Sequence, residues 1–266
     1  MVGGFLQMND SADLTAHYES LDAGVPVPSV DDSPATKLLP FVLSVTAGSV
    51  DTIGFLGLSG LFTAHITGNL VVLAARLVAR DQAPLAPLLA VPVFMVALAL
   101  TRLLAAGLQR IQIGSLLPLL ALQLLLLSGF FAVCTAAGPT IDPNSASMIF
   151  AGMLGVCAMA VQNALVRISL KGAPTTAVMT TNVTVFTMNV VEILLRRGAN
   201  GAARARERAR HTWPAIAGFL LGCALGAAGQ SAFGLRSLAL PAGFALLALA
   251  LGMIAARLDA VKADRA

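Results

Sequence analysis

Two groups of polar residues interrupt the apolar runs of this chain, and their types suit the binding of a solute. The first group consists of His65, Thr67, Gly68 and Asn69, and the second of Thr180, Thr181 and Asn182. Threonine, glycine and asparagine favour turns and helix caps, because they serve the N–H groups that are left unpaired at a helix start. Each group is therefore predicted to begin a half-helix whose partially positive end faces a polar or anionic solute.

A carboxyl group lies deep inside the first apolar run. Asp51 follows Leu38 by about thirteen residues, which is roughly 20 Å along a helix. An ionised side chain in hydrocarbon costs about 2.5 to 3.5 kcal/mol, so Asp51 needs a partner or a proton and is a candidate for function. The alternative is a neutral Asp51 that hydrogen-bonds helices together. His65 is a candidate for gating or proton shuttling, and its alternative is an ordinary hydrogen-bonding role.

A comparison of the chain with itself shifted by 113 positions points to two further polar residues. This shift aligns Asn69 with Asn182. It also aligns Gln162 and Asn163 with Ser49 and Val50, which directly precede Asp51. They are predicted to hydrogen-bond Asp51 or to line the same polar site, and helix bridging is the alternative.

The second group continues into a polar helical face. Asn182, Asn189 and Glu192 can share one side of a helix. An ion pair with Arg196, four residues further on, is the simpler role for Glu192. On the first apolar run, small residues recur at Gly48, Gly54, Gly57 and Gly60. Such a strip predicts the close approach of another backbone.

Composition assigns the chain to the membrane. Of its 266 residues 57% are hydrophobic and 11% are charged, whereas soluble domains carry about 25% charged residues. The apolar runs are near twenty residues long, which requires spanning helices. Cys134, Cys157 and Cys223 stand alone and fit neither a metal site nor a disulfide framework, so no metal or cofactor is predicted. The basic residues lie in loops beside apolar runs, which argues against nucleic-acid binding.

The predicted fold is an all-α, polytopic membrane helix bundle with eight apolar segments. An acidic tail over 1–35 is expected to be disordered, because it has few large apolar residues. One transmembrane domain follows over 36–257, with repeats at about 38–137 and 146–257, and residues 258–266 form a tail. The segments are 38–59, 61–79, 84–108, 114–137, 146–168, 174–195, 213–233 and 236–257.

The arrangement of basic residues favours six spanning helices over eight. Lys and Arg in short loops favour the cytoplasm. If all eight segments crossed, Arg102, Arg110, Arg167, Lys171 and Arg236 would lie outside. If segments 61–79 and 174–195 are re-entrant, only Arg76, Arg80 and Arg236 lie outside, and the basic stretch 196–211 becomes a cytoplasmic loop. Both termini are then cytoplasmic, and the two halves form an inverted repeat.

Two sequence patterns resemble the YoaK-type family of bacterial inner-membrane proteins, a family of unknown function. One is Gly48, Val50 and Asp51 leading to Thr67-Gly68-Asn69, and the other is Gln162-Asn163-Ala164 leading to Thr175-Thr176 and Thr180. The resemblance covers about residues 36–257. This chain has Thr181 where that family commonly repeats glycine. The resemblance implies a multi-spanning protein of the inner membrane but no substrate.

The leading hypothesis is a small-solute transporter or channel with a polar site at the interface of the two repeats. Its predicted partners are the lipid bilayer, a small polar or anionic solute, protons and a second copy of the chain. A structural or regulatory membrane protein is the alternative. An intramembrane enzyme is disfavoured, because Ser59 in "GLSG" has only His65 nearby and no separate element supplies a base. We therefore expect no enzymatic activity.

Overall fold

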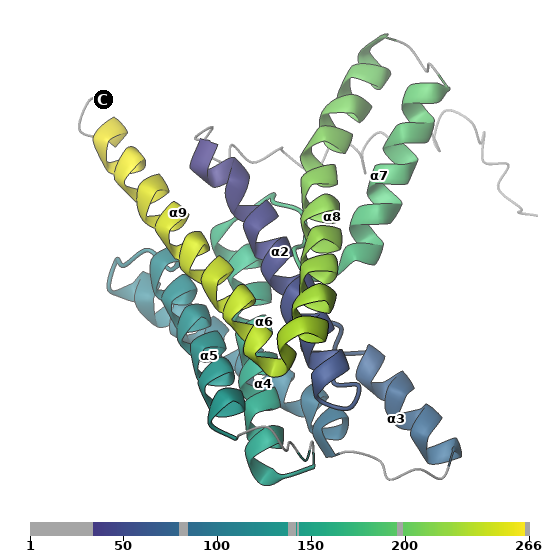
Figure 1. Ribbon diagram of the computed structural model, residues 1–266. Helices are drawn as coiled ribbons and strands as arrows, with labels where there is room; N and C mark the ends of the chain where they lie inside the picture. Colours follow the sequence, from purple (N-terminus) through teal and green to yellow (C-terminus); the bar gives the residue numbers. More distant parts are fainter. Residues whose placement is uncertain (1–33, 80–84, 138–141, 143, 196–198, 264–266) are drawn as a thin grey trace, which may run out of the picture.

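The computed structural model describes residues 34–79, 85–137, 142, 144–195 and 199–263, and over these residues the chain is helical without any strand. This agrees with the predicted all-α class. The elements are α2 (Pro34–Gly57), α3 (Gly68–Val78), α4 (Leu85–Arg110), α5 (Leu116–Ala136), α6 (Ala146–Ser169), α7 (Met179–Leu194), α8 (Ala199–Phe233), the 3₁₀ helix η1 (Gly234–Leu238) and α9 (Ala239–Ala263). Figure 1 shows them as one bundle.

The chain is an integral membrane protein with several spanning helices. Five stretches of the described residues are long and apolar enough to cross a bilayer, namely Lys37–Gly57, Leu85–Arg110, Leu116–Ala136, Ala146–Ser169 and Gly201–Leu258. The last stretch contains most of α8, all of η1 and most of α9. The two remaining helices, α3 and α7, have 11 and 16 residues, fewer than the roughly 20 that a perpendicular span needs.

Helices α2 and α6 form the centre of the bundle, and α4 lies at its surface. In the most apolar 18-residue stretch of each helix, 72% of α2 and 67% of α6 are buried, whereas only 17% of α4 is buried. Large apolar side chains such as Met95 and Leu103 are exposed on α4. Because lipid tails solvate apolar side chains, this surface of α4 is suited to face the bilayer.

The close approach predicted from the glycine strip of α2 is confirmed at Gly48, and the neighbouring helix is α8. A Cβ atom added at Gly48 would overlap the backbone carbonyl oxygen of Phe219. The contact is reciprocal, since a Cβ at Gly222 of α8 would overlap the carbonyl oxygen of Val45 on α2. Small residues on both helices therefore let the two backbones touch, which is a common way of packing helices in membranes.

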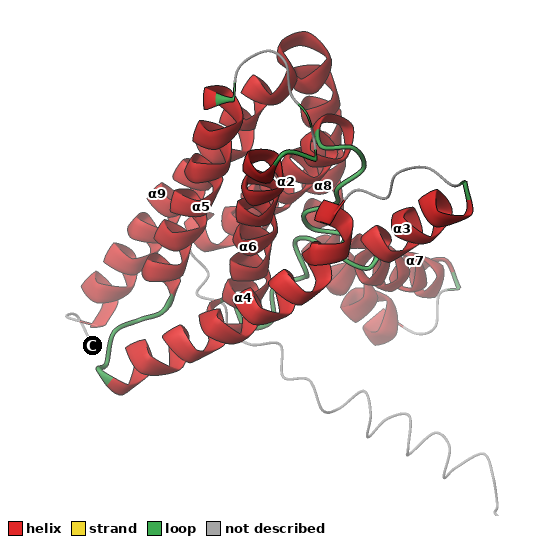
Figure 2. Cartoon of the chain, turned by 90° about the horizontal axis from the view of Figure 1, so that it is seen from below, coloured by secondary structure: helices red, strands yellow, loops and turns green. Residues whose placement is uncertain are grey.

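The two short helices begin at the two polar motifs. Helix α3 begins at Gly68 and α7 at Met179, so the apolar segments predicted over 61–79 and 174–195 are helical only in their second parts. Figures 1 and 2 together show α3 and α7 on the same flank of the bundle. In Figure 1, α3 ends near the bottom and α7 ends near the top, so their N-terminal ends are nearer to the middle of the molecule.

The basic stretch at 196–211, predicted as a loop, is largely helical. Helix α8 begins at Ala199 and includes Arg204 to Arg210, because alanine and arginine are strong helix formers. Glu192 pairs with Arg208 of α8 at 3.5 Å. Its predicted partner Arg196 lies outside the described residues, as does most of the predicted tail 1–35. Helix α9 continues to Ala263, within the predicted tail 258–266.

Candidate functional site

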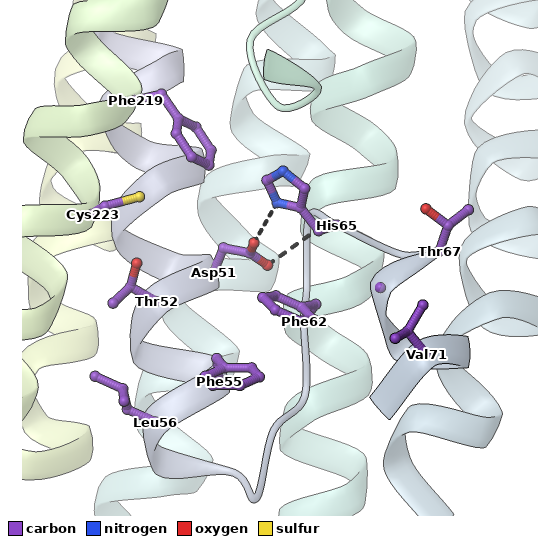
Figure 3. A pocket seen from close by; sticks show the side chains of 11 residues that line it. Asp51, Thr52, Phe55, Leu56, Phe62, His65, Thr67, Val71, Phe219 and Cys223 are labelled. Atoms are coloured by element: carbon purple, nitrogen blue, oxygen red, sulfur yellow. Dashed lines mark hydrogen bonds and ion pairs between the residues drawn. The ribbon is translucent and has the colours of Figure 1, made fainter. Parts of the chain in front are cut away.

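The carboxylate of Asp51 fixes the course of the chain after α2. Its Oδ1 atom accepts hydrogen bonds from the backbone N–H groups of Thr63 and Ala64, both at 2.7 Å, and from the Thr63 hydroxyl at 3.3 Å. Asp51 is 3% exposed. The chain turns at Ser59 and Gly60, which have φ of 54° and 87°, and returns beside α2 (Figure 3). These hydrogen bonds replace those that a carboxylate loses to water when it is buried. Asp51 therefore has a structural role, which is to hold the returning chain against α2.

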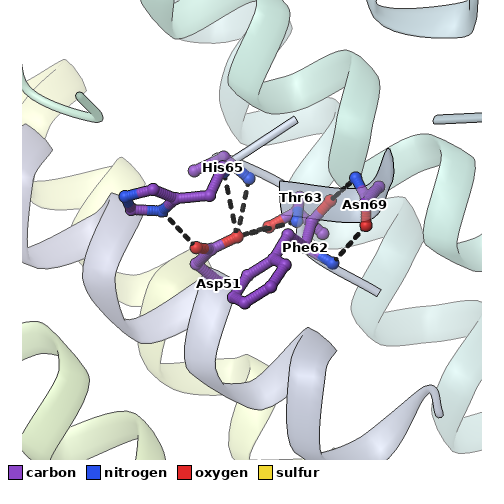
Figure 4. Close-up of polar contacts among 6 residues, drawn as sticks. Asp51, Phe62, Thr63, His65 and Asn69 are labelled. Carbon is purple, nitrogen blue, oxygen red and sulfur yellow. Dashed lines mark hydrogen bonds and ion pairs between the residues drawn. The ribbon is translucent and has the colours of Figure 1, made fainter. Parts of the chain in front are cut away.

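The second oxygen of Asp51 pairs with a histidine. The Nδ1 atom of His65 lies 2.7 Å from Oδ2 of Asp51 (Figure 4). The side chain of His65 is 39% exposed, whereas that of Asp51 is 5% exposed. The imidazole therefore stands between the buried carboxylate and the space outside. Asp51 can accept a hydrogen bond from Nδ1–H of a neutral imidazole and equally from Nδ1–H of an imidazolium. Protonation of His65 at Nε2 can therefore change the charge of this pair while the contact is kept.

A cavity of about 550 Å³ lies in front of this pair, between α2, α3, α8 and the returning chain (Figure 3). Its size falls within the range of small-molecule sites. One part of the lining is aromatic, and the rings of Phe55 and Phe62 stack with centroids 4.5 Å apart. The lining residues are Asp51, Thr52, Phe55, Leu56, Phe62, His65, Thr67, Gly68, Val71, Phe219 and Cys223.

No group of three or more His, Cys, Asp or Glu side chains that could hold a metal ion occurs in the part of the chain that the structure describes.

The side chain of Asn69 braces the returning chain rather than capping α3. Its Oδ1 accepts the backbone N–H of Phe62 at 2.9 Å, and its Nδ2 donates to the Phe62 carbonyl at 2.8 Å. The N-cap residue of α3, Thr67, makes no side-chain capping bond. The predicted start of a helix at this motif is therefore confirmed, but the predicted capping role of its side chains is wrong.

The second half of the chain repeats the contact made by Asn69. The Nδ2 atom of Asn182 donates to the carbonyl of Thr175 at 2.6 Å, and the Thr175 hydroxyl donates to Oδ1 of Asn182 at 3.1 Å. Thr175 follows Phe62 by 113 positions, as Asn182 follows Asn69. The sequence repeat thus corresponds to a repeated local structure, in which an asparagine of a short helix holds the chain seven residues before it.

Gln162 bridges helices, which is one of the two roles that its sequence position left open, and its amide group makes its hydrogen bonds away from Asp51. Its Nε2 atom donates to the carbonyl of Leu43 at 3.0 Å and to the hydroxyl of Thr176 at 2.8 Å. Its Oε1 accepts from Gln123 of α5 at 2.7 Å. Leu43 precedes Asp51 by about two helical turns, so Gln162 meets α2 at a different level. It joins α2, α5, α6 and the chain before α7.

The other predicted residues divide into two sets. Thr67 and Gly68 line the cavity together with Asp51 and His65. The remaining residues do not line it. Asn163 and Asn189 each donate to a carbonyl four residues earlier in their own helix, those of Met159 at 2.8 Å and Val185 at 2.7 Å, and Thr180 and Thr181 are exposed on α7.

Several contributors were missed in the sequence. Phe62 and Phe219 line the cavity, Thr63 binds Asp51, and Gln123 binds Gln162. Gln123 had a detectable signal, since it stands alone in the apolar run "LLALQLLLL". The pair of Phe62 and Thr175 would have followed from the same shift of 113 positions. Phe219 had no signal, because nothing local distinguishes it from a lipid-facing residue.

Replacing Asn69 or Asn182 with alanine is expected to destabilise the protein to a similar extent. Asn69→Ala leaves the N–H and the carbonyl of Phe62 without their partner, and Asn182→Ala does the same to the carbonyl and the hydroxyl contact of Thr175. An unpaired polar group that is buried costs about 1 to 3 kcal/mol. We expect the free energy of unfolding in mixed detergent micelles to fall by about 2 kcal/mol for each variant. Asn163→Ala is the control, because the carbonyl that Asn163 contacts belongs to a helix. Equal stability of all three variants would contradict the bracing role.

A family comparison covers the described site. A model of the DUF1275 family, described as a protein of unknown function, matches residues 39–251. The chain belongs to the DUF1275 family. The matched range of this DUF1275 chain begins in α2 and ends in α9, so it includes the cavity and both asparagine contacts. It is consistent with the resemblance to YoaK-type proteins. Searches of curated proteins and of solved structures gave no match.

Proposed function

We propose that this protein moves a small solute across a bacterial inner membrane, as a transporter or channel, with the solute bound in the cavity before Asp51 and His65. The observation that carries the proposal is a buried carboxylate paired at 2.7 Å with a half-exposed histidine, on the wall of a cavity of about 550 Å³. An intramembrane carboxylate that faces a cavity is a common feature of solute and proton pathways. No enzymatic activity is part of the proposal.

The proposed topology has six spanning helices, α2, α4, α5, α6, α8 and α9, with α3 and α7 as re-entrant half-helices in an inverted repeat. Three observations support it: the short lengths of α3 and α7, their opposite positions in Figure 1, and the matching contacts of Asn69 and Asn182. Transporters use such broken helices to aim N-terminal ends at a solute. In this topology both termini are cytoplasmic, as the distribution of basic residues favours.

The cavity suits a solute with an apolar body and a polar or anionic group. Phe55, Phe62 and Phe219 supply an apolar wall. The polar group would meet His65 and the start of α3 at Thr67 and Gly68. The N–H groups of Gly68, Asn69 and Leu70 already donate to the carbonyls of His65, Ile66 and Thr67, so this helix end would favour negative charge through its dipole. Because the charge of the His65–Asp51 pair depends on a proton, the proposal includes sensitivity of transport to pH.

Flux through proteoliposomes tests the role of His65. A panel of radiolabelled organic anions and neutral polar solutes would first be screened with the unchanged protein. We expect His65→Gln to lower the flux of the solute found by about tenfold or more, because a hydrogen bond to a charged group contributes about 1.5 to 3 kcal/mol. The variant should also flatten the pH dependence of the flux, because glutamine cannot take up the proton that changes the charge of the pair.

Matched controls separate the site from general effects. His211→Gln removes a histidine that binds the carbonyl of Gly172, and Glu192→Gln removes an exposed carboxylate on α7. Both variants should retain the flux and its pH profile. Unchanged flux in His65→Gln, for a solute that the protein moves, would overturn the assignment of the site.

A further inference from the structure

A second cavity, of about 730 Å³, lies between α4 and α6, away from Asp51. Helix α4 and the end of α6 supply its walls. One group of lining residues is cationic or polar, and the other is apolar. The first group is Arg102, Gln109, Arg167 and Lys171, and the second is Met95, Leu98, Ala99, Ala164 and Ile168. We call this cavity the α4–α6 groove.

The two kinds of lining residue are ordered along both helices. On α4, Met95, Leu98 and Ala99 precede Arg102 by three to seven positions, and Gln109 comes seven positions later. These spacings keep all five on one helical face. On α6, Ala164 precedes Arg167 by three positions, and Lys171 follows just after the helix. The groove is therefore apolar toward one end and basic toward the other.

Among the residues that the structure describes, the three basic groups face the groove without a compensating carboxylate. No Asp or Glu lines the groove, and no ion pair involves Arg102, Arg167 or Lys171 within the described ranges of the chain. All three side chains are exposed. Positive charges that converge without an acidic partner favour an anion, and arginine matches a phosphate with two parallel N–H donors.

We propose that the α4–α6 groove binds an anionic phospholipid. The phosphate lies among Arg102, Arg167 and Lys171, and an acyl chain lies along Met95, Leu98 and Ala99. Two observations favour a lipid over a soluble anion: the apolar part of the groove continues from the basic part, and α4 is the most exposed of the long apolar helices. Basic pockets between membrane helices bind anionic headgroups in this manner.

Binding of a short-chain phosphatidylglycerol to the purified full-length protein in neutral detergent tests the proposal. The shift of the thermal unfolding midpoint would be followed during titration, with short-chain phosphatidylcholine as the uncharged comparison. A basic residue near an anionic surface contributes roughly fivefold to binding, so the triple variant Arg102→Gln, Arg167→Gln, Lys171→Gln should weaken phosphatidylglycerol binding by about a hundredfold.

Two further variants keep the test specific. Arg204→Gln, Arg206→Gln, Arg210→Gln removes the same number of charges from exposed positions of α8 outside the groove, and it should bind phosphatidylglycerol as the unchanged protein does. Ala99→Phe fills the apolar part while keeping all three cations. It should weaken binding of phosphatidylglycerol but leave that of inorganic phosphate as it was.

The outcomes distinguish a bound lipid from a free anion and from a general effect of surface charge. Loss of binding in the groove variants alone supports the proposal. Equal loss in both triple variants would assign the effect to general surface charge and overturn it. Stabilisation by inorganic phosphate that matches the stabilisation by phosphatidylglycerol, with Ala99→Phe unchanged, would identify a site for free anions instead. Unaltered binding in the groove triple variant would also overturn it.

Discussion

Replacing Asp51 with alanine is expected to release the chain that returns along α2 and to destabilise the protein more than alanine at Asn69 or Asn182 does. The backbone N–H groups of Thr63 and Ala64 lose their acceptor, and these two residues are buried, at 0% and 4% exposed. Each unpaired buried donor costs about 1 to 3 kcal/mol. We therefore expect the free energy of unfolding to fall by about 3 to 5 kcal/mol, measured by denaturation in mixed micelles.

Asp51→Asn separates the structural role of this residue from its charge. The asparagine carbonyl can still accept from Thr63 and Ala64, and its NH₂ group can donate to Nδ1 of His65 when that atom carries no proton. This variant should therefore lose about 1 to 2 kcal/mol of stability but should lose the negative charge of the carboxylate completely. A protein with Asp51→Ala that unfolds as the unchanged protein does would contradict the structural role.

Both oxygens of Asp51 have partners, which explains why the two interpretations of its sequence position are not exclusive. An intramembrane carboxylate suggested either function or the joining of helices. The Oδ1 atom holds the returning chain, and the Oδ2 atom meets His65 at the cavity. Loss of the Oδ1 contacts should therefore lower stability, and loss of the Oδ2 charge should lower flux. Asp51→Asn is needed to separate these two effects, because it keeps the Oδ1 contacts and removes the charge.

The helix starts were predictable from local chemistry, but the direction of the side chains was not. Thr67 and Gly68 favour the start of a helix, and α3 begins there. Asn69 was expected to serve the same helix start, yet its amide group binds the backbone of Phe62. Capping a helix and bracing the preceding chain both use the amide group of the asparagine side chain. The choice depends on how the preceding chain folds back, which is a tertiary feature that no local pattern encodes.

The position of Gln162 shows a similar limit. The shift of 113 positions predicted its depth near that of Asp51, but a helical side chain turns by about 100° per residue, so neighbouring positions face different helices. Gln162 faces Gln123 and Leu43 instead. The basic residues Arg102 and Arg167 were likewise interpreted only as topology signals. Their convergence on one groove depends on the packing of α4 against α6, which charge counting cannot supply.

Alanine at Gly48 or Gly222 is expected to separate α2 from α8. In each case the new methyl group would overlap a backbone carbonyl of the facing helix, that of Phe219 or Val45. A backbone carbonyl cannot rotate away as a flexible side chain can, so the helices must move apart. Overpacking of this kind costs about 1 to 3 kcal/mol. Because Phe219 also lines the cavity, Gly48→Ala should reduce solute flux as well as stability.

Gly107→Ala is the matched control, since a Cβ atom there meets nothing within 4 Å. It should raise the free energy of unfolding by up to about 1 kcal/mol, the difference in helix propensity between alanine and glycine. The double variant at Gly48 and Gly222 carries the sharper test. Once the first alanine has separated the two helices, the second meets less resistance, so the combined loss should be smaller than the sum of the single losses. Strictly additive losses would instead indicate that the structure adjusts independently around each new methyl group. That result would contradict a rigid backbone contact between α2 and α8.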